Sequence, residues 1–375
     1  MDNDKRRFLR NTSCGLLGVL SMVAFARNGY PAFLANDKCL GLEDIPLKVI
    51  AKNRGILFGT AVTYQQLSKD TKFSALVARE AKLITPIQEL KWQTLRPGPG
   101  RFDYRKAEYL IQFAEKNNQM VRGHTLMWHM GIPNWALKEI SSGNADKIMT
   151  EHIKQVVGNF KGRIYSWDVV NEVASNSKSE LLRKSPWGNK GTIDYIHDAF
   201  SVAHEADPSA LLVFNDHQVE YDTSKQNAKR YNILKIVEKL ITLGTPIHAF
   251  GIQAHLYGKK KIAKNHLMSF IDNLSQFGLE VHITELDVKD QRLPKNPQER
   301  DLIVANIYND FLESILVSKN IKVLNLWGLS DRYSWYNHKF IREDGMPARP
   351  LLYDDELMPK EVRLIVAKQL CAYGS

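Results

Sequence analysis

The sequence has few cysteines and no long apolar run. Three cysteines in 375 residues are too few for a disulfide-stapled scaffold. The apolar stretch at residues 14–25 is too short to cross a membrane as a helix. Hydrophobic residues make up 44% of the chain and charged residues 25%, a globular composition that excludes a disordered or collagen-like protein.

Several functional motifs are also absent. Residues 58–61 read Phe-Gly-Thr-Ala where a dinucleotide-binding fold would carry G-x-G-x-x-G after its first strand. The sequence has no H-E-x-x-H and no G-x-S-x-G, which argues against a catalytic metal and a nucleophilic serine. We therefore expect no metal and no cofactor. Lys and Arg outnumber Asp and Glu by 51 to 41, but they form no basic stripe, so we expect no nucleic-acid partner.

The first 26 residues have the features of an export signal. Lys5, Arg6 and Arg7 precede the apolar stretch, and residues 24–26 read Ala-Phe-Ala, which resembles a cleavage site. We predict export to the periplasm or the extracellular space. The basic residues before Phe8-Leu9 resemble a twin-arginine signal shifted by one residue, so twin-arginine export, general secretion and an uncleaved membrane anchor all remain open.

Two cysteines lie near the ends of the mature chain. Cys39 falls in a lead-in segment, residues 27–54, and Cys371 falls close to the C-terminus. A closed fold could bring the two together, so a disulfide and two free thiols are both compatible with the sequence.

Residues 55–375 alternate between apolar strands and amphipathic helices. We predict helices such as 71–82, 104–116, 194–205, 227–243 and 299–318. The predicted strands are 56–62, 83–89, 120–128, 164–172, 211–217, 249–256, 279–287 and 323–329. Eight strands alternating with helices predict an α/β protein with a single (β/α)8 TIM barrel. We expect this barrel to act as a monomer.

Active sites of such barrels lie at the C-terminal ends of the strands. Polar and aromatic side chains gather there in this chain, and Glu172 and Glu285 end the fourth and seventh predicted strands. These two strand ends lie across the barrel mouth from each other. Paired carboxylates among tryptophans are typical of glycoside hydrolysis.

The motifs at these strand ends resemble those of family 10 glycoside hydrolases, the retaining endo-β-1,4-xylanases. The resemblance covers nearly all of residues 55–370. Its strongest parts are Gly-His-Thr-Leu-Met-Trp-His at 123–129, Trp-Asp-Val-Val-Asn-Glu at 167–172 and Thr-Glu-Leu-Asp at 284–287. Further matches lie at 215–216, 251–256, 327–328 and 334–335.

The resemblance implies a role for each matching residue. Glu172 would be the general acid/base and Glu285 the nucleophile that forms a covalent intermediate. Asn171 would bind a sugar 2-hydroxyl, and His255 would bridge Glu285 and Asp287. The implied substrate contacts are Lys91, His124, Trp128, Asn215, Gln253, Trp327 and Trp335.

Two structural expectations follow from the residue chemistry. Ionised Glu285 should keep nearby Glu172 protonated until the ester forms. Asn171 and Glu172 are consecutive, so both can reach one site only if the strand bends or bulges there. We expect His282 to serve packing, together with Trp92, Trp135, Trp167 and Trp187.

The chain departs from the family pattern at several positions. Ile87 and Gln88 stand where Glu and Asn are usual, Gly131 where Gln is usual, and His217 where Tyr is common. The changes at 87, 88 and 131 fall in the implied second glycone subsite. Glycone subsites hold the sugars on the side of the cleaved bond whose terminal sugar becomes attached to the nucleophile, and the second is counted from that bond. A retaining hydrolase of another β-linked glycan is therefore an alternative to a xylanase.

Two other features bear on the substrate. A non-catalytic glycan-binding barrel is disfavoured, because both carboxylates and their partners are present. The basic residues 259–261 and Lys264 follow the sixth predicted strand, which places them near the catalytic face, where they could attract an acidic xylan.

Overall fold

A computed structural model describes residues 41–188 and 192–372. The predicted export signal lies outside the described residues, and so does Cys39, on which the choice between a disulfide to Cys371 and two free thiols depends. None of the helices within the two described ranges is long and apolar enough to cross a membrane.

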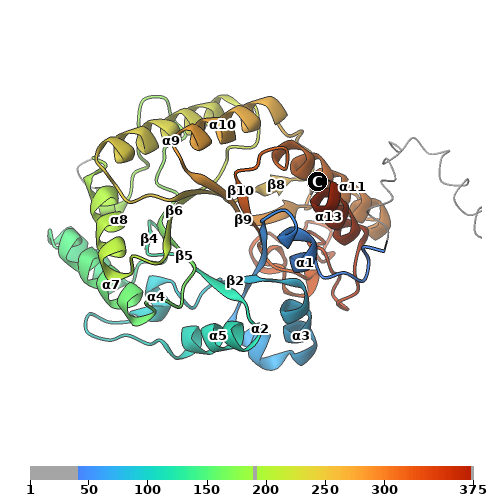
Figure 1. Cartoon of the computed structure of the whole chain (residues 1–375), viewed down its shortest axis with the longest axis horizontal. Helices are drawn as coiled ribbons and strands as arrows, with labels where there is room; N and C mark the ends of the chain where they lie inside the picture. Colours follow the sequence, from blue (N-terminus) through green and yellow to red (C-terminus); the bar gives the residue numbers. More distant parts are fainter. Residues whose placement is uncertain (1–40, 189–191, 373–375) are drawn as a thin grey trace, which may run out of the picture. The chain divides into compact units, whose positions relative to one another are not determined.

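Parallel strands close into a barrel at the centre of the fold (Figure 1). The ring runs β10-β1-β2-β3-β5-β6-β7-β9 and closes through the pairing of β10 with β9. Two short strands extend it, since β4 pairs with β5 and β8 pairs with β9. The bounds are β1 Leu57–Val62, β2 Leu83–Pro86, β3 Met120–Gly123, β4 Met127–Trp128, β5 Ser166–Asn171, β6 Leu211–Asp216, β7 Ala249–Ile252, β8 His255–Tyr257, β9 Glu280–Lys289 and β10 Ile321–Leu326.

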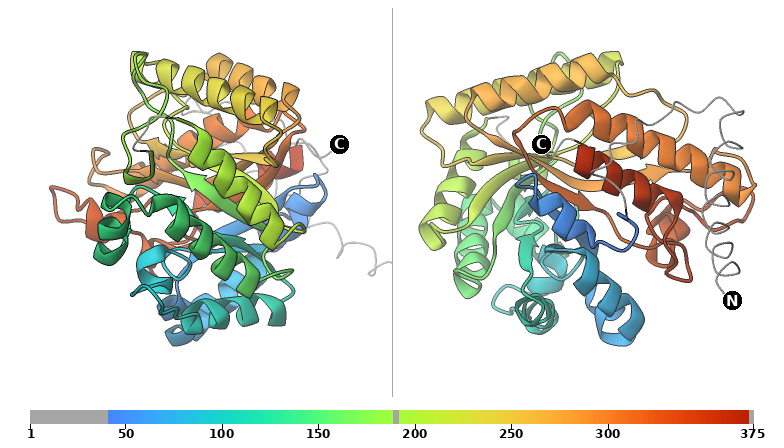
Figure 2. Two further views of the ribbon diagram at one scale, coloured as in Figure 1. Left: turned by 90° about the vertical axis from the view of Figure 1, so that its left-hand side faces the viewer. Right: turned by 45° about the vertical axis from the view of Figure 1, so that its right-hand side comes forward.

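Helices surround the barrel, and Figure 2 shows α13 beside α11. Side-chain caps fix where several of them begin: Asp70 accepts from the Phe73 amide at 2.9 Å, and Asn296 caps a helix that opens with Pro297. The bounds are α1 Leu47–Lys52, α2 Tyr64–Lys69, α3 Thr71–Glu80, α4 Trp92–Leu95, α5 Arg105–Lys116, α6 Asn134–Ser141, α7 Ala145–Asn159, α8 Asp194–Ala206, α9 Ser224–Thr242, α10 Lys264–Gln276, α11 Pro297–Ile315, α12 Tyr336–Lys339 and α13 Glu361–Ala372.

The predicted barrel is confirmed, but three predicted strands are longer than the strands in the structure. The strand at 83–89 ends at Pro86. The strands at 120–128 and 249–256 are each divided, into β3 and β4 and into β7 and β8. Ala254 lies at the second break with a φ of 61°, a left-handed conformation that ends the regular ladder. Apolar periodicity does not reveal such breaks, because the residues on both sides remain buried.

Candidate active site

Glu172 stands directly after β5 on a backbone that breaks the strand alternation. Its φ is 59°, and the β5–β6 register shifts between Asp168 and Val170. Asn171 and Glu172 consequently reach the same site: Gln253 Nε2 donates to Asn171 Oδ1 at 3.2 Å and to Glu172 Oε1 at 3.1 Å. The expected bend at the end of this strand is therefore present.

Glu285 lies within β9 and is held by the same group of amides. Asn215 Nδ2 donates to Glu285 Oε1 and to Asn171 Oδ1, each at 2.9 Å. A hydrogen-bonded chain thus runs from Glu285 through Asn215, Asn171 and Gln253 to Glu172. It fixes both carboxylates relative to one another at the barrel mouth.

His255 bonds to two carboxylates, as the resemblance implied. Its Nε2 lies 3.2 Å from Glu285 Oε2, and its Nδ1 lies 2.8 Å from Asp287 Oδ1. Asp287 also accepts from Trp335 Nε1 at 2.7 Å and from the Tyr336 hydroxyl at 2.8 Å. Burial alone would lower the pKa of His255, but Asp287 and Glu285 raise it to about 10.

The resulting imidazolium acts on the carboxylate next to it. Burial favours the neutral form of Glu285, yet the hydrogen bond and charge of His255 lower its pKa overall. Glu285 is therefore an ionised carboxylate in a buried position, the state that a nucleophile requires.

Glu172 lies against a different cation, Arg183. The guanidinium is 3.5 Å from Glu172 Oε2, 2.7 Å from His129 Nε2 and 3.1 Å from His217 Nε2. Burial raises the pKa of Glu172. The charge that His217 carries when protonated, a hydrogen bond from Gln253 and, with a smaller effect, the charge of Arg183 together lower it to about 2. Burial lowers the pKa of both His129 and His217, so near pH 7 both are neutral and the arginine supplies the lasting charge.

This environment corrects one expectation. Glu285 was expected to keep Glu172 protonated, whereas the pKa of Glu172 lies at about 2 in the structure. The expectation counted only the repulsion between two carboxylates. Arg183 lies in the segment after β5, and no strand pattern or motif spacing placed it beside Glu172.

Aromatic and basic side chains complete the walls of the site. Lys91 Nζ lies 4.9 Å from the centroid of the Trp128 ring. Trp327 lies between two imidazoles, with its ring centroid 5.4 Å from that of His124 and 6.1 Å from that of His255. His124 Nδ1 bonds to an aspartate at 2.8 Å, and burial lowers the pKa of His124 to about 3, so this imidazole is neutral.

Asn215 occupies a different place from the other implied substrate contacts. It is fully buried, its Nδ2 bonds to Asn171 and Glu285, and its Oδ1 accepts from the Thr284 hydroxyl at 2.7 Å. Its amide is therefore used within the protein, and it positions the residues around the carboxylates.

Known proteins resemble this chain over nearly its whole length. The sequence model of glycosyl hydrolase family 10 matches residues 46–369. The chain belongs to glycosyl hydrolase family 10. A beta-1,4-xylanase of Dictyoglomus thermophilum is 33% identical over 339 residues, which cover 87% of this chain and 91% of the relative. An endo-1,4-beta-xylanase B of Thermotoga neapolitana is 32% identical over 325 residues, or 85% of this chain and 90% of that one.

Solved structures agree with this family assignment. Xylanase 10B from Thermotoga petrophila RKU-1, determined in complex with xylobiose, matches with a TM-score of 0.79 and 29% identity. That match covers 88% of this chain and 99% of the solved chain. The chain is therefore a glycosyl hydrolase with the TIM-barrel fold of its family.

The departures from the family pattern lie at three places around the mouth. Ile87 and Gln88 lie in the loop between β2 and α4, where Ile87 is partly exposed and Gln88 exposed. Gly131 has a φ of 67°, and a Cβ there would lie 3.9 Å from the Trp128 ring. His217 follows β6 and contacts the guanidinium that faces Glu172.

The structure adds three residues that sequence analysis did not assign to the site: His129, Arg183 and Tyr336. His129 belongs to a quoted motif, and Tyr336 adjoins one, so both could have been examined from their position. Arg183 had no such signal.

Residues assigned to packing do lie in packed surroundings. Trp167 is fully buried, and the Trp92 ring stacks on His152 at 3.6 Å between centroids. His282 is buried and bonds to Glu280 at 3.3 Å. The described ranges contain no group of three His, Cys, Asp or Glu residues placed to hold a metal ion.

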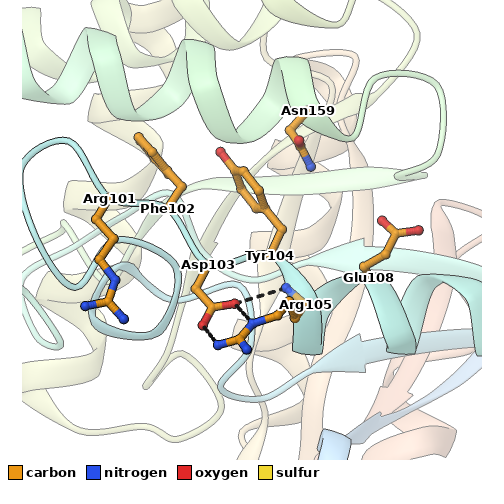
Figure 3. Close-up of a pocket in the computed structure, with 7 residues that line it drawn as sticks. All are labelled: Arg101, Phe102, Asp103, Tyr104, Arg105, Glu108 and Asn159. Carbon is orange, nitrogen blue, oxygen red and sulfur yellow. Dashed lines mark hydrogen bonds and ion pairs between the residues drawn. The ribbon is translucent and has the colours of Figure 1, made fainter.

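An open pocket of about 540 Å³ lies apart from the active site, around the start of α5 (Figure 3). Its one aspartate, Asp103, is bonded to Arg105 at 2.6 Å and 2.9 Å. It contains neither of the carboxylates at the barrel mouth. The lining residues are Arg101, Phe102, Asp103, Tyr104, Arg105, Glu108 and Asn159.

Proposed function

We propose that this family 10 glycosyl hydrolase cleaves internal β-1,4-xylosidic bonds of xylan by double displacement. The observation that carries the proposal is the pair of carboxylates at the mouth. Glu285 is ionised beside the His255 imidazolium, and it is linked to Glu172 through shared amides. A carboxylate nucleophile and a second carboxyl group for proton transfer are the two groups that retaining glycosidases need.

In the first step, a Glu285 oxygen attacks the anomeric carbon. The glycosidic bond breaks, and its oxygen takes the proton of Glu172, leaving a glycosyl ester on Glu285. In the second step, Glu172 takes a proton from water, the water oxygen attacks the anomeric carbon, and Glu285 leaves as a carboxylate. The configuration at that carbon is retained.

Glu172 must carry a proton for the first step, although its pKa is about 2 in this structure. We propose that a sugar bound beside Glu172 raises this pKa by excluding water and separating the carboxyl group from Arg183. Their contact is 3.5 Å long, a loose hydrogen bond that a substrate could replace.

Asn171 is available for a sugar hydroxyl. Its Nδ2 is buried and has no hydrogen-bond partner within the described part of the chain. Buried donors normally have partners, and a sugar 2-hydroxyl would satisfy this one, as the family resemblance implies.

The substrate can be tested by product analysis on purified xylan, β-glucan and mannan. Xylan should be shortened to oligosaccharides, and NMR of the first product should show the β-anomer before mutarotation. A first product with the α-anomer would contradict double displacement. The xylanases among the relatives support xylan as the substrate.

A second candidate keeps the mechanism and changes the glycan. It is favoured by Ile87, Gln88 and Gly131, because Ile87 lacks the carboxylate and Gly131 lacks the amide that the family usually places in the second glycone subsite. In the same experiment, faster cleavage of β-glucan or mannan than of xylan would select this candidate.

We further propose that the enzyme is exported by residues 1–26 and acts outside the cytoplasm as a monomer. The basic segment, apolar stretch and Ala-Phe-Ala sequence support export. Fractionation of the native host, with N-terminal sequencing of the exported protein, tests location and cleavage together. Sedimentation equilibrium of that protein tests the monomer.

A further inference from the structure

A second pocket adjoins the mouth of the barrel. It has a volume of about 280 Å³, and its lining contains four cationic side chains and no Asp or Glu. It shares Tyr257 and Lys289 with a pocket at the mouth that His217, His255 and Trp335 line. The basic pocket is lined by Tyr257, Gly258, Lys259, Lys260, Lys289, Gln291, Arg292 and Leu293.

Strand register places this pocket close to the catalytic residues. Tyr257 pairs with Lys289 two residues beyond the pairing of His255 with Asp287. Side chains two residues apart share a face, and they lie about 7 Å apart along a strand. The pocket therefore continues the face that holds the nucleophile's partners.

The position in the ring also assigns the pocket to one side of the cleavage point. In the ring order, β2 lies opposite β7 and β3 lies opposite β9. Ile87, Gln88 and Gly131, in the implied second glycone subsite, follow β2 and β4, whereas Tyr257 and Lys289 end β8 and β9. The pocket thus lies on the opposite side, where the leaving part of the chain would extend.

The cations of the pocket contact aromatic rings. Lys260 Nζ lies 4.6 Å from the centroid of the Tyr257 ring, and Lys289 Nζ lies 4.0 Å from that of Phe340. By contrast, Lys264 in the neighbouring segment pairs with Glu313 at 3.4 Å. Within the described ranges, no carboxylate lies within 4.0 Å of the charged groups of Lys259, Lys260, Lys289 or Arg292.

Two further observations indicate an anionic, hydrogen-bonding ligand. Burial and then the charge of Arg292 lower the pKa of Lys289, and the charge of Asp287 offsets this only in part, so the like charges of Lys289 and Arg292 are close enough to repel. The side-chain oxygen and nitrogen of Gln291 are buried without a hydrogen-bond partner in the described part of the chain. A ligand with a carboxylate and hydroxyl groups would relieve the repulsion and could bond to Gln291.

We propose that the basic pocket binds the carboxylate of a uronic acid branch carried by the xylan chain. The inference rests on the proposed function, since it supplies the class of decorated xylan that the same cleft accepts. Lys260, Lys289 and Arg292 give charge-assisted hydrogen bonds to the carboxylate. The ring of Tyr257 offers an apolar face to the branch sugar.

The test compares glucuronoxylan with the same polymer after its uronic acids have been reduced to neutral sugars. The two substrates have the same chain and branch positions and differ in charge. The quantity measured is the ratio of kcat/KM on the acidic polymer to kcat/KM on the reduced polymer, at low salt. In Lys260→Gln/Lys289→Gln/Arg292→Gln this ratio should fall about tenfold, mainly through KM, because three charge contacts to the branch carboxylate are lost.

A matched control removes the same net charge elsewhere. Lys116→Gln/Lys239→Gln/Lys319→Gln changes three exposed lysines on other parts of the barrel and should leave the ratio within about twofold of the wild type. Thermal unfolding of both triple variants checks that they fold.

Each other outcome has a definite meaning. An unchanged ratio in the pocket variant overturns the inference, and so does an equal fall in both variants, which would show general charge attraction. If the wild type cleaves the reduced polymer as well as the acidic one, the inference fails and the proposed function stands. If it cleaves neither, the proposed function fails and the inference fails with it.

Discussion

At the scale of single residues, the two carboxylates at the mouth are ionised for different reasons. Glu285 faces a histidine whose pKa is raised to about 10 by two acidic neighbours. Glu172 faces Arg183, a cation that keeps its charge over the whole working range of pH. A nucleophile needs the first arrangement, whereas the second opposes the protonated form that a general acid needs.

Arg183 should therefore contribute, with His217, to the alkaline limit of activity. The variant Arg183→Gln removes a positive charge beside Glu172, which raises the pKa of that carboxyl group. The alkaline limb of the kcat/KM profile on xylan, which reports the pKa of the acid in the free enzyme, should move to higher pH. Lys184→Gln is the matched control, because it removes a charge from an exposed side chain next in sequence and should leave the limb in place. An alkaline limb that stays fixed in Arg183→Gln would show that the arginine does not govern Glu172.

The activity lost on replacing each glutamate should also depend differently on the leaving group of the substrate. Glu285→Ala should be inactive on xylan and on aryl xylosides alike, because every substrate needs the nucleophile. Glu172→Ala should lose about 10²–10⁴-fold on xylan but much less on aryl xylosides with acidic phenols, which leave without a proton. The comparison requires kcat/KM for a series of phenols in each variant. Equal losses across the series in Glu172→Ala would contradict its role as the acid.

At the scale of secondary-structure elements, the positions of the strand ends were predictable and the finer shape of those ends was not. Alternating apolar strands and helices placed Glu172, Glu285 and His255 at one mouth, because all parallel strands of a barrel end on the same side. The left-handed backbone at Glu172 was expected only as some bend, and the break at Ala254 was not expected. Arg183 escaped prediction because it lies in an irregular segment, where no periodicity fixes which way a side chain points.

The loop between β2 and α4 gives a test of the altered glycone subsite. Ile87→Glu/Gln88→Asn should raise kcat/KM on xylotriose-sized substrates more than on polymeric xylan, because charge-assisted hydrogen bonds to a remote sugar assist the chemical step. Long substrates occupy more sites and depend less on this one. The kcat/KM on xylotriose and on xylan is measured for each variant.

Position 131 is less suited to this test. A Gln there would have to adopt the left-handed φ of 67°, which is strained for any residue with a Cβ. Gly131→Ala therefore serves as the control for backbone strain alone. If Ile87→Glu/Gln88→Asn gains nothing on short substrates, the proposed weakening of this subsite by the two departures is wrong.

At the scale of the whole molecule, the barrel gathers residues that lie far apart in the chain. Lys91 and Trp335, near opposite ends of the barrel sequence, both lie at the mouth, joined through the rings of Trp128, His124, Trp327 and His255. The site is therefore stable only while the barrel is closed. Conversely, the buried charges of the site contribute to the stability of the barrel as a function of pH.

The His255–Asp287 pair gives a measurable form of this coupling. The pKa of His255 is raised from 6.5 to about 10 in the folded protein, so its stabilising contribution is fully present below pH 6.5 and is lost as the pH rises through 10.

Asp287→Asn removes the carboxylate that raises this pKa most, so it should lower Tm strongly at pH 6 and progressively less toward pH 10. Glu108→Gln, which breaks the pair with Arg163 at 2.8 Å, is the control: the pairing lowers the pKa of Glu108 and raises that of Arg163, so both stay charged from pH 6 to 10 and its loss of Tm should hold constant. Unfolding followed by circular dichroism at several pH values measures both differences. A loss in Asp287→Asn that is independent of pH would mean that His255 is not charged in the folded enzyme, and with it the stated reason for the low pKa of Glu285 would fail.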